Sequence, residues 1–101
     1  MSSFDIDKLD DVIHSRLRLG IMTLLADSEA ETFNALKEAL KATQGNLSIQ
    51  LRKLEEAGYV SIDKQIVSRK TLTTARLTPE GRKAFDAYLE ALYSMVGRKP
   101  D

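Results

Sequence analysis

The 101-residue sequence predicts a mainly α-helical domain with one small β-hairpin, an α+β fold. In four segments the apolar residues recur at three- and four-residue steps, which is typical of amphipathic helices. In a fifth segment, residues 59–77, polar and apolar residues alternate, as in half-buried strands. The length of the chain suits one domain over residues 1–101.

The first apolar pattern covers about residues 8–26 and predicts one helix or two helices in succession. Ser15 is a candidate cap at a break between them. The polar residues 27–31 are expected to form a loop. Thr32 can then cap a short helix that carries Phe33, Leu36 and Leu40, because its hydroxyl can accept a bond from a free amide of the first turn.

A third helix is predicted over about residues 43–57, after a tight turn. Thr43 is its candidate cap. Leu47, Leu51 and Leu54 share one face of this helix, because residues three and four positions apart lie on the same side. Gly58 is expected to end it, since glycine readily adopts the left-handed conformation that follows many helices.

The alternating segment predicts two strands joined by a polar, basic tip. The first strand starts at Tyr59, the second covers residues 72–77, and residues 65–71 form the tip. Thr78 is the expected cap of a last helix over residues 79–96. Pro79 occupies its first position, where the missing amide costs nothing, and the helix dipole favours Glu80.

The composition excludes most catalytic and metal-binding chemistry. The chain has no cysteine, and its only histidine, His14, is expected to be a surface or packing residue. We therefore expect no enzyme activity, no metal site and no cofactor. No stretch reaches the roughly 20 apolar residues of a membrane helix, and the acidic N-terminus is unlike a signal peptide. These features predict a cytoplasmic protein without membrane contact.

Positive charge is concentrated in the centre of a chain whose formal net charge is zero. Residues 41–83 contain nine basic and four acidic side chains, whereas residues 1–40 contain four basic and eight acidic ones. A local excess of this kind can attract a polyanion even when the total charge is neutral.

The predicted order of elements is that of a winged helix-turn-helix. In this fold the third helix enters the major groove of DNA, and the hairpin, or wing, reaches the backbone or the minor groove. Amide side chains can pair with adenine, basic ones with guanine or phosphate, and an aliphatic one can meet the thymine methyl group. The candidate DNA contacts are Gln44, Asn46, Ser48, Ile49, Arg52 and Lys53 in the helix, and Lys64, Ser68, Arg69, Lys70 and Thr71 in the wing.

Taken singly, these signals have simpler explanations. A polar and basic helix face is usually only a solvated face, and a basic hairpin tip is common on many proteins. Ile49 is equally well a groove contact or an exposed apolar residue without a role. The polar and basic helix face and the basic hairpin tip occur in this order inside the one positive segment of the chain, and this combination favours DNA binding.

Two stretches resemble the winged-helix transcription regulators of the MarR and ArsR type. These are Leu54-Glu55-Glu56-Ala57-Gly58-Tyr59-Val60 and Leu77-Thr78-Pro79-Glu80-Gly81-Arg82. The motifs Gly45-Asn46-Leu47-Ser48 and Arg18-Leu19 fit the same pattern, so the resemblance covers about residues 12–90. It is strongest with short, stand-alone winged-helix DNA-binding domains of bacteria and archaea.

The resemblance implies a prokaryotic DNA-binding homodimer. Its third helix and wing would contact DNA, and its terminal helices would form the dimer surface. The chain lacks the cysteines of the metal-sensing branch and is shorter than typical drug-responsive members. A small-molecule effector is therefore compatible with the family but not indicated.

Dimerisation also has a physical argument. One domain offers few base contacts, whereas two copies related by a twofold axis read two half-sites. The last helix carries more apolar residues than one face can bury, although these residues could also cover only the single core. The candidate interface residues are Leu9, Val12, Phe85, Tyr88, Leu89, Leu92, Tyr93 and Val96.

The predicted function is a sequence-specific regulator of transcription that binds double-stranded DNA as a homodimer. The alternative is a protein–protein interaction module that kept the winged-helix shape without binding DNA. The neutral net charge and Glu56 on the presumed DNA face favour this alternative.

Overall fold

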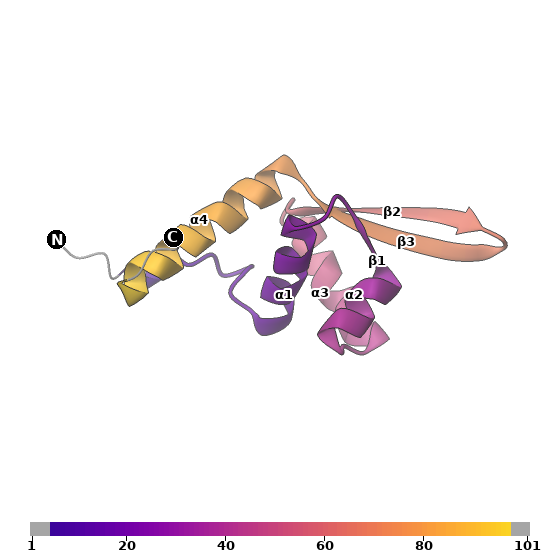
Figure 1. Cartoon of the computed structure of the whole chain (residues 1–101), viewed down its shortest axis with the longest axis horizontal. Helices are drawn as coiled ribbons and strands as arrows, with labels where there is room; N and C mark the ends of the chain where they lie inside the picture. The colour runs from indigo at the N-terminus through magenta and orange to yellow at the C-terminus, as the bar shows by residue number, and fades with distance from the viewer. Residues whose placement is uncertain (1–4, 98–101) are drawn as a thin grey trace.

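The computed structural model describes residues 5–97, so the four residues at each end of the predicted domain lie outside the described part. Figure 1 shows α1, α2 and α3 grouped in the middle, a long hairpin projecting from one end, and α4 extending toward the other. This is the predicted α+β winged helix-turn-helix. The elements in order are η1 (Ile6–Lys8), α1 (Arg16–Ala26), β1 (Glu31–Thr32), α2 (Phe33–Leu40), α3 (Gln44–Glu56), β2 (Val60–Val67), β3 (Lys70–Leu77) and α4 (Pro79–Val96).

Threonine caps place three of the helices where they were predicted. The hydroxyls of Thr32, Thr43 and Thr78 accept bonds from amides three residues further on, at 3.1, 3.1 and 2.9 Å. Each bond satisfies an amide that the first turn of a helix leaves free. Gly58, with φ of 84°, follows α3 in the expected left-handed conformation.

Of the two alternatives for residues 8–26, the structure has the break at Ser15, with α1 starting at Arg16. The part before the break is not a helix as expected, because η1 is a single 3-10 turn. Between η1 and α1, the Asp10 carboxylate accepts the amides of Val12 and Ile13 at 2.8 and 3.2 Å. Such a side-chain bond competes with the helix for the same amides. Ser15 does occupy the cap position, but its side chain makes no capping bond.

The sheet is antiparallel in the order β1-β3-β2. The expected loop over residues 27–31 needs a correction, because Glu31 and Thr32 form β1 and pair with Ala75 and Thr74 of β3. Two residues are too few to show an alternating pattern in the sequence. Strand β1 ties the start of α2 to the base of the hairpin.

The wing has longer strands and a tighter turn than predicted. The β2–β3 pairing runs without a break from Val60 opposite Leu77 to Val67 opposite Lys70, so residues 65–71 are not a loop. Only Ser68 and Arg69 form the turn, with φ of 52° and 67°. Positive φ at both central residues is typical of two-residue hairpin turns, because their twist matches that of the strands.

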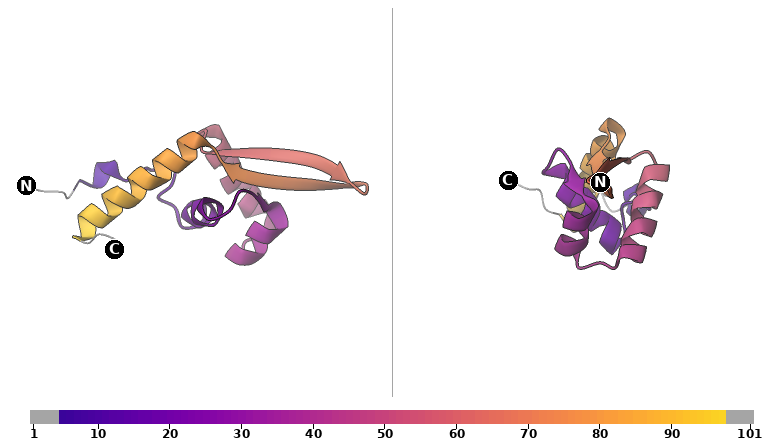
Figure 2. Two further views of the ribbon diagram at one scale, coloured as in Figure 1. Left: turned by 45° about the horizontal axis from the view of Figure 1, so that its top comes forward. Right: turned by 90° about the vertical axis from the view of Figure 1, so that its right-hand side faces the viewer.

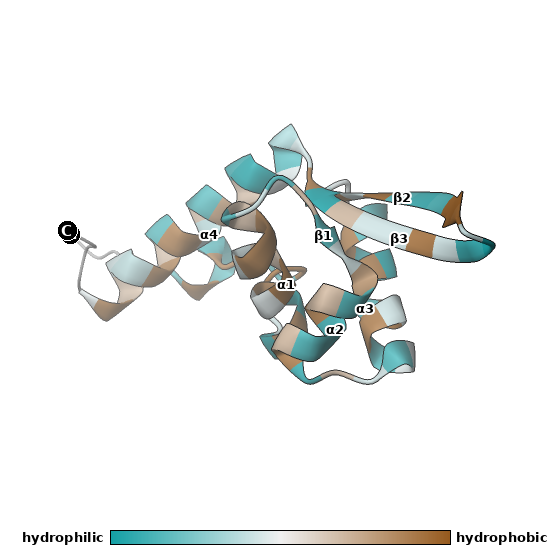
Figure 3. Ribbon diagram, turned by 45° about the vertical axis from the view of Figure 1, so that its right-hand side comes forward, coloured by the Kyte–Doolittle hydropathy of each residue, from teal (hydrophilic) through white to brown (hydrophobic). Residues whose placement is uncertain are grey.

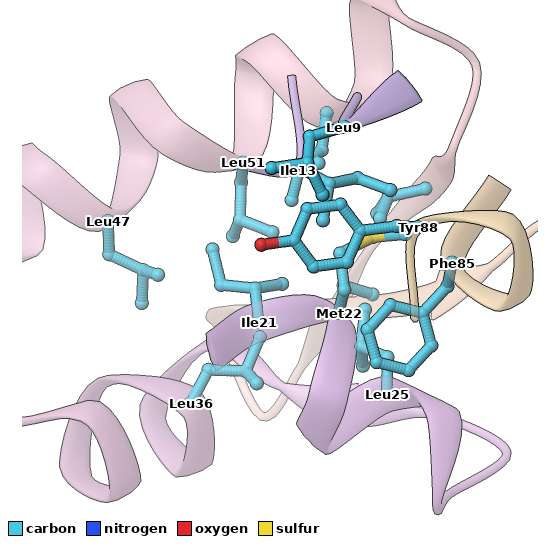
Figure 4. Packing of buried hydrophobic residues seen from close by; sticks show 13 residues of the cluster. Leu9, Ile13, Ile21, Met22, Leu25, Leu36, Leu47, Leu51, Phe85 and Tyr88 are labelled. Atoms are coloured by element: carbon cyan, nitrogen blue, oxygen red, sulfur yellow. The ribbon is translucent and has the colours of Figure 1, made fainter. Parts of the chain in front are cut away.

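One hydrophobic core joins the three central helices to the base of the wing and to the start of α4. Figure 4 shows Tyr88 and Phe85 of α4 packed beside Ile21, Met22 and Leu25 of α1. The hydroxyl of Tyr88 lies 2.8 Å from Nδ1 of the exposed His14, so His14 acts here as a packing partner. The buried residues are Leu9, Ile13, Ile21, Met22, Leu25, Leu36, Leu47, Leu51, Leu54, Val60, Ala75, Phe85 and Tyr88.

The core leaves the outer part of the wing exposed and the far part of α4 only half-buried. The molecule measures 58 × 26 × 24 Å, and the left view in Figure 2 shows the wing and the far part of α4 extending beyond the helical body. Among residues 5–97, no helix has the length and apolar character needed to cross a bilayer. In the same range, no three acidic or histidine side chains are grouped as a metal site.

Candidate nucleic-acid interface

Helix α3 separates its apolar and polar residues between two faces, as the sequence predicts. Leu47, Leu51 and Leu54 are buried in the core. Ile49 points away from them and keeps 51% of its surface exposed. The candidate residues that are exposed on this helix are Gln44, Asn46, Ser48, Ile49, Arg52 and Lys53.

An open groove of about 590 Å³ lies between α3 and the wing. It is lined by four of the predicted contacts, Gln44, Ser48, Arg52 and Lys64. The structure therefore brings helix and wing candidates together along one surface. The other lining residues are Phe33, Leu51, Glu55, Ile62 and Thr73.

The strand register divides the wing candidates between two faces. Lys64 lies opposite Thr73, and Ile66 lies opposite Thr71. Since paired residues share a face and every second residue repeats it, these positions continue the face that borders α3. Thr71 also lines a smaller hollow, of about 290 Å³, together with Gln44.

Lys70 lies on the other face of the wing, because it pairs with Val67. Ser68 and Arg69 form the exposed turn between the two strands. Lys64 and Thr71 are thus on the side of the groove, whereas Lys70 is separated from them by the thickness of the sheet.

Two of the α3 candidates lie on the flank away from the wing. Lys53 lines a shallow hollow with Asp11 and Val12 of the segment before α1 and with Arg18 of α1. Asn46 accepts a bond at 2.9 Å from the side-chain amide of Gln50. The exposed face of α3 therefore has a wing-side flank and an N-terminal flank.

Several residues of this surface are not among the predicted contacts. Glu55 lines the groove three positions after Arg52, and helical spacing could have placed it there. Ile66 is 79% exposed on the groove side of the wing. It was missed because the strand was expected to end before it. Arg18 and Gln50, which connect α1 to Asn46, have no signal in sequence spacing because they are 32 residues apart.

The predicted dimer surface needs a correction. Leu9, Phe85 and Tyr88 are only 7%, 6% and 2% exposed inside a single protomer, so they are not available to a partner. Along α4, buried and exposed apolar residues follow each other within one or two turns. The apolar pattern of the sequence therefore did not show which of them face the core and which face outward. Of the other candidates, Val12, Leu89, Leu92 and Tyr93 are half-buried and Val96 is 59% exposed.

The base of the wing is fixed by hydrogen bonds to its neighbours. The hydroxyl of Tyr59 donates to the Asp10 carboxylate at 2.5 Å. This bond, together with partial burial and the nearby negative charge, raises the pKa of Tyr59 to about 12. The hydroxyl of Thr78 donates to the carbonyl of Gly58 at 2.6 Å. The junction of α3, β2 and α4 thus holds the wing at a defined angle to α3.

Comparison with known proteins agrees with this architecture. A family profile described as "Winged helix DNA-binding domain" matches residues 17–96. An uncharacterized protein of Methanocaldococcus jannaschii is 40% identical over 78 residues, which cover 77% of this chain and 85% of that protein.

Similar solved structures are those of transcriptional regulators. A transcriptional regulator homologue from Pyrococcus horikoshii is 28% identical with a TM-score of 0.76, covering 90% of this chain and 95% of that one. A MarR family regulator from Streptomyces coelicolor, solved in complex with DNA, is 22% identical with a TM-score of 0.66, covering 90% of this chain and 64% of that one. The second likeness shows the fold alone.

The family match extends over α1, the helix-turn-helix, the wing and α4, the elements that form the core and the groove. The matched family consists of DNA-binding regulators and not of enzymes. The chain therefore belongs to the winged-helix DNA-binding domain family, and its structural neighbours include MarR-family and ArsR-family transcriptional regulators.

Proposed function

We propose that the protein is a sequence-specific transcription regulator that binds double-stranded DNA as a homodimer. Helix α3 lies in the major groove, and the wing lies on the adjacent backbone or minor groove. The observation that carries this proposal is the shared groove, because Gln44, Ser48 and Arg52 of α3 border the same open space as Lys64 of the wing.

The exposed side chains suit both the base edges and the phosphates of a duplex. Gln44, Ser48 and Asn46 lie near the N-terminus of α3, the part of a recognition helix that reaches base edges. Arg52 and Lys64 supply positive charge next to them, where phosphates would lie. Ile49 offers an apolar contact to a thymine methyl group. Arg69 and Ser68 extend the contact at the wing turn.

Glu55 restricts where the duplex can lie in the groove. A carboxylate repels phosphates, but it can accept a hydrogen bond from the amino group of cytosine. With Glu55 beside Arg52 in one groove, this surface favours a base edge over an unbroken run of phosphates. Such an arrangement supports sequence-specific binding more than non-specific binding to the backbone.

Two considerations support the homodimer: the apolar residues of α4, and the need to read two half-sites. Val96 is 59% exposed, and hydrophobic segments continue along α4 to its far end (Figure 3), where Leu92 packs against the core but stays half-buried. Dimer contacts by Leu89, Leu92 and Tyr93 beside Val96 would place two α3 helices on one side of a duplex.

The second candidate is an interaction module that binds a protein. The zero net charge of the chain and the exposed Glu55 and Glu56 on α3 favour it. A protein partner would occupy the same face of α3, so the two candidates differ in the ligand and not in the location of the site.

Selection of bound duplexes from a random pool, followed by fluorescence anisotropy at several salt concentrations, tests the proposal. We expect an enriched inverted repeat with half-sites about 10 base pairs apart, and an affinity that falls steeply with salt. A pool without enrichment, with no duplex binding at low salt, would reject the proposal and favour the interaction module.

A further inference from the structure

A chain of hydrogen bonds runs from α1 to the exposed side of α3. The Nε atom of Arg18 donates to the carbonyl of Val12 at 2.5 Å. A terminal nitrogen of the same guanidinium donates to Oε1 of Gln50, also at 2.5 Å. The Nε2 atom of Gln50 then donates to Oδ1 of Asn46 at 2.9 Å. We call these three side chains, Arg18, Gln50 and Asn46, the amide relay.

The amide relay has a fixed direction. A guanidinium has donors and no acceptor, so Gln50 must turn its carbonyl oxygen toward Arg18. The NH₂ group of Gln50 then faces Asn46, which must present its own carbonyl oxygen to it. The two donors of the Asn46 amide group are left on the outward side. A free asparagine could turn either end outward, but this one has its orientation set by Arg18.

Arg18 is itself held in place. It is half-buried, and its second bond, to the Val12 carbonyl, anchors it to the turn that precedes α1. Asn46 and Gln50 lie one helical turn apart, a spacing that brings their side chains together on α3. Arg18, the fixed end of the relay, is therefore half-buried, and Asn46, the end whose orientation can change, lies on the exposed face of α3.

We propose that Arg18 and Gln50 are positioning residues that decide which base the protein reads at Asn46. With its NH₂ group outward, Asn46 favours base edges that carry acceptors, such as guanine O6 and N7 or thymine O4. It disfavours cytosine, whose exposed group in the major groove is a donor. This inference rests on the proposed function only in placing Asn46 against base edges.

Gln50→Glu tests the direction of the relay. The new carboxylate still accepts from Arg18, but it has no donor for Asn46. Asn46 must then turn its NH₂ group inward and its oxygen outward. We expect the preferred base at that position to shift from guanine or thymine toward a base with a donor amino group in the major groove, cytosine or adenine. Gln50→Leu, which only removes the relay, should reduce the discrimination there by about tenfold.

The measurement is a parallel selection from one random pool with each variant. Asn46→Ala identifies the base pair that Asn46 reads, because the sequence preference of this variant should be lost at that base pair alone. Arg18→Met should act like Gln50→Leu. Arg16→Met is the matched control, because Arg16 lies on the same helix outside the relay and should leave that preference unchanged. Thermal unfolding of each variant confirms that it is folded.

The outcomes separate the inference from the proposed function. If the preference at the Asn46 base pair is the same in the wild type, Gln50→Leu and Gln50→Glu, the relay has no positioning role and the inference is wrong. If Asn46→Ala changes no base preference, Asn46 does not read a base. If the wild type binds no duplex, the proposed function fails together with the inference.

Discussion

Asp10 shows how one side chain can set the local backbone and join two distant segments. One carboxylate oxygen accepts the amides of Val12 and Ile13, and the other accepts the hydroxyl of Tyr59. The first contact ends any continuous helix through residues 8–15. The second connects the N-terminal segment to the start of the wing. Acidic residues near the N-terminus thus have a structural role that their contribution to net charge does not reveal.

Tyr59→Phe should weaken this connection. We expect the free energy of unfolding at pH 7 to fall by about 1 kcal/mol, because a partly buried hydrogen bond is lost. The hydroxyl of Tyr59 has its pKa raised from 10.0 to about 12, so the folded state keeps this proton longer than the unfolded state. Its stabilisation is complete below pH 10 and is lost as the pH rises toward 12.

Urea unfolding measured from pH 7 to pH 12 checks both the loss of stability in Tyr59→Phe at pH 7 and its dependence on pH. The wild type should lose more stability than Tyr59→Phe over the alkaline range. Parallel curves for the two proteins would show that the Asp10 contact contributes nothing to the stability of the fold.

Gly81 allows α4 to start directly against the end of α3. A Cβ atom at this position would lie 2.0 Å from the carbonyl oxygen of Tyr59, a backbone atom that cannot move away alone. Gly81→Ala should therefore lower the free energy of unfolding by about 3 kcal/mol or more.

Gly45→Ala is the matched control for Gly81→Ala. Gly45 also lies in the first turn of a helix, but no atom lies within 4 Å of its added Cβ. Alanine should stabilise α3 there by up to about 1 kcal/mol. Denaturant unfolding of both variants measures the difference, and equal losses of stability would contradict the close contact at Tyr59.

Elements with strong local signals were predictable from the sequence. The caps Thr43 and Thr78 and the leucines of α3 placed two helices within a residue of their observed bounds. The break at Ser15 was predicted, but the helix expected before it was wrong, because Asp10 captures amides that the apolar pattern assigned to a helix. Strand β1 was missed because its pairing partner lies more than 40 residues away, in β3. The strand register decides which face of the wing each side chain lies on. The sequence left the register open, because residues 65–71 were expected to be a loop and not paired strands.

The two faces of the wing should contribute unequally to DNA binding. Lys64 borders the groove with Arg52, whereas Lys70 lies on the opposite face. Lys64→Ala should lower the affinity for every duplex and reduce the salt slope by about 0.9, the effect of one phosphate contact. Lys70→Ala is matched in charge and exposure and should have a smaller effect.

Anisotropy titrations of both lysine variants over a range of salt concentrations measure these slopes. A larger loss for Lys70→Ala than for Lys64→Ala would mean that the duplex lies against the other face of the wing.

At the scale of the whole molecule, the wing and α4 extend to opposite ends of the long axis (Figure 1). A twofold axis near the end of α4 would leave both wings and both α3 helices free for one duplex. The proposed interface consists of half-buried and exposed residues on the far half of α4, because Phe85 and Tyr88 in its first part are buried in the core. The proposed DNA surface and the proposed dimer surface are thus separate parts of the molecule.

Val96→Glu should weaken the dimer. Val96 is 59% exposed in the protomer, so the substitution adds a charge without disturbing the core. Burial of that charge in an interface is costly, and we expect the dissociation constant of the dimer to rise at least about tenfold. Ala39→Glu, on the exposed side of α2, is the control.

Sedimentation equilibrium of the wild type and both variants measures this constant. The protomer has a mass of 11.3 kDa, so monomer and dimer are easily distinguished. A wild type that stays monomeric, or a dimer insensitive to Val96→Glu, would contradict the α4 interface.

The proposed function requires the exposed face of α3 and the groove side of the wing to contact one duplex together. NMR mapping of backbone amides during titration with a selected duplex measures this contact residue by residue. We expect the largest shifts between residues 44 and 53 and between residues 64 and 71, with α4 little affected. Shifts confined to α4, or no shifts with excess duplex at low salt, would contradict it.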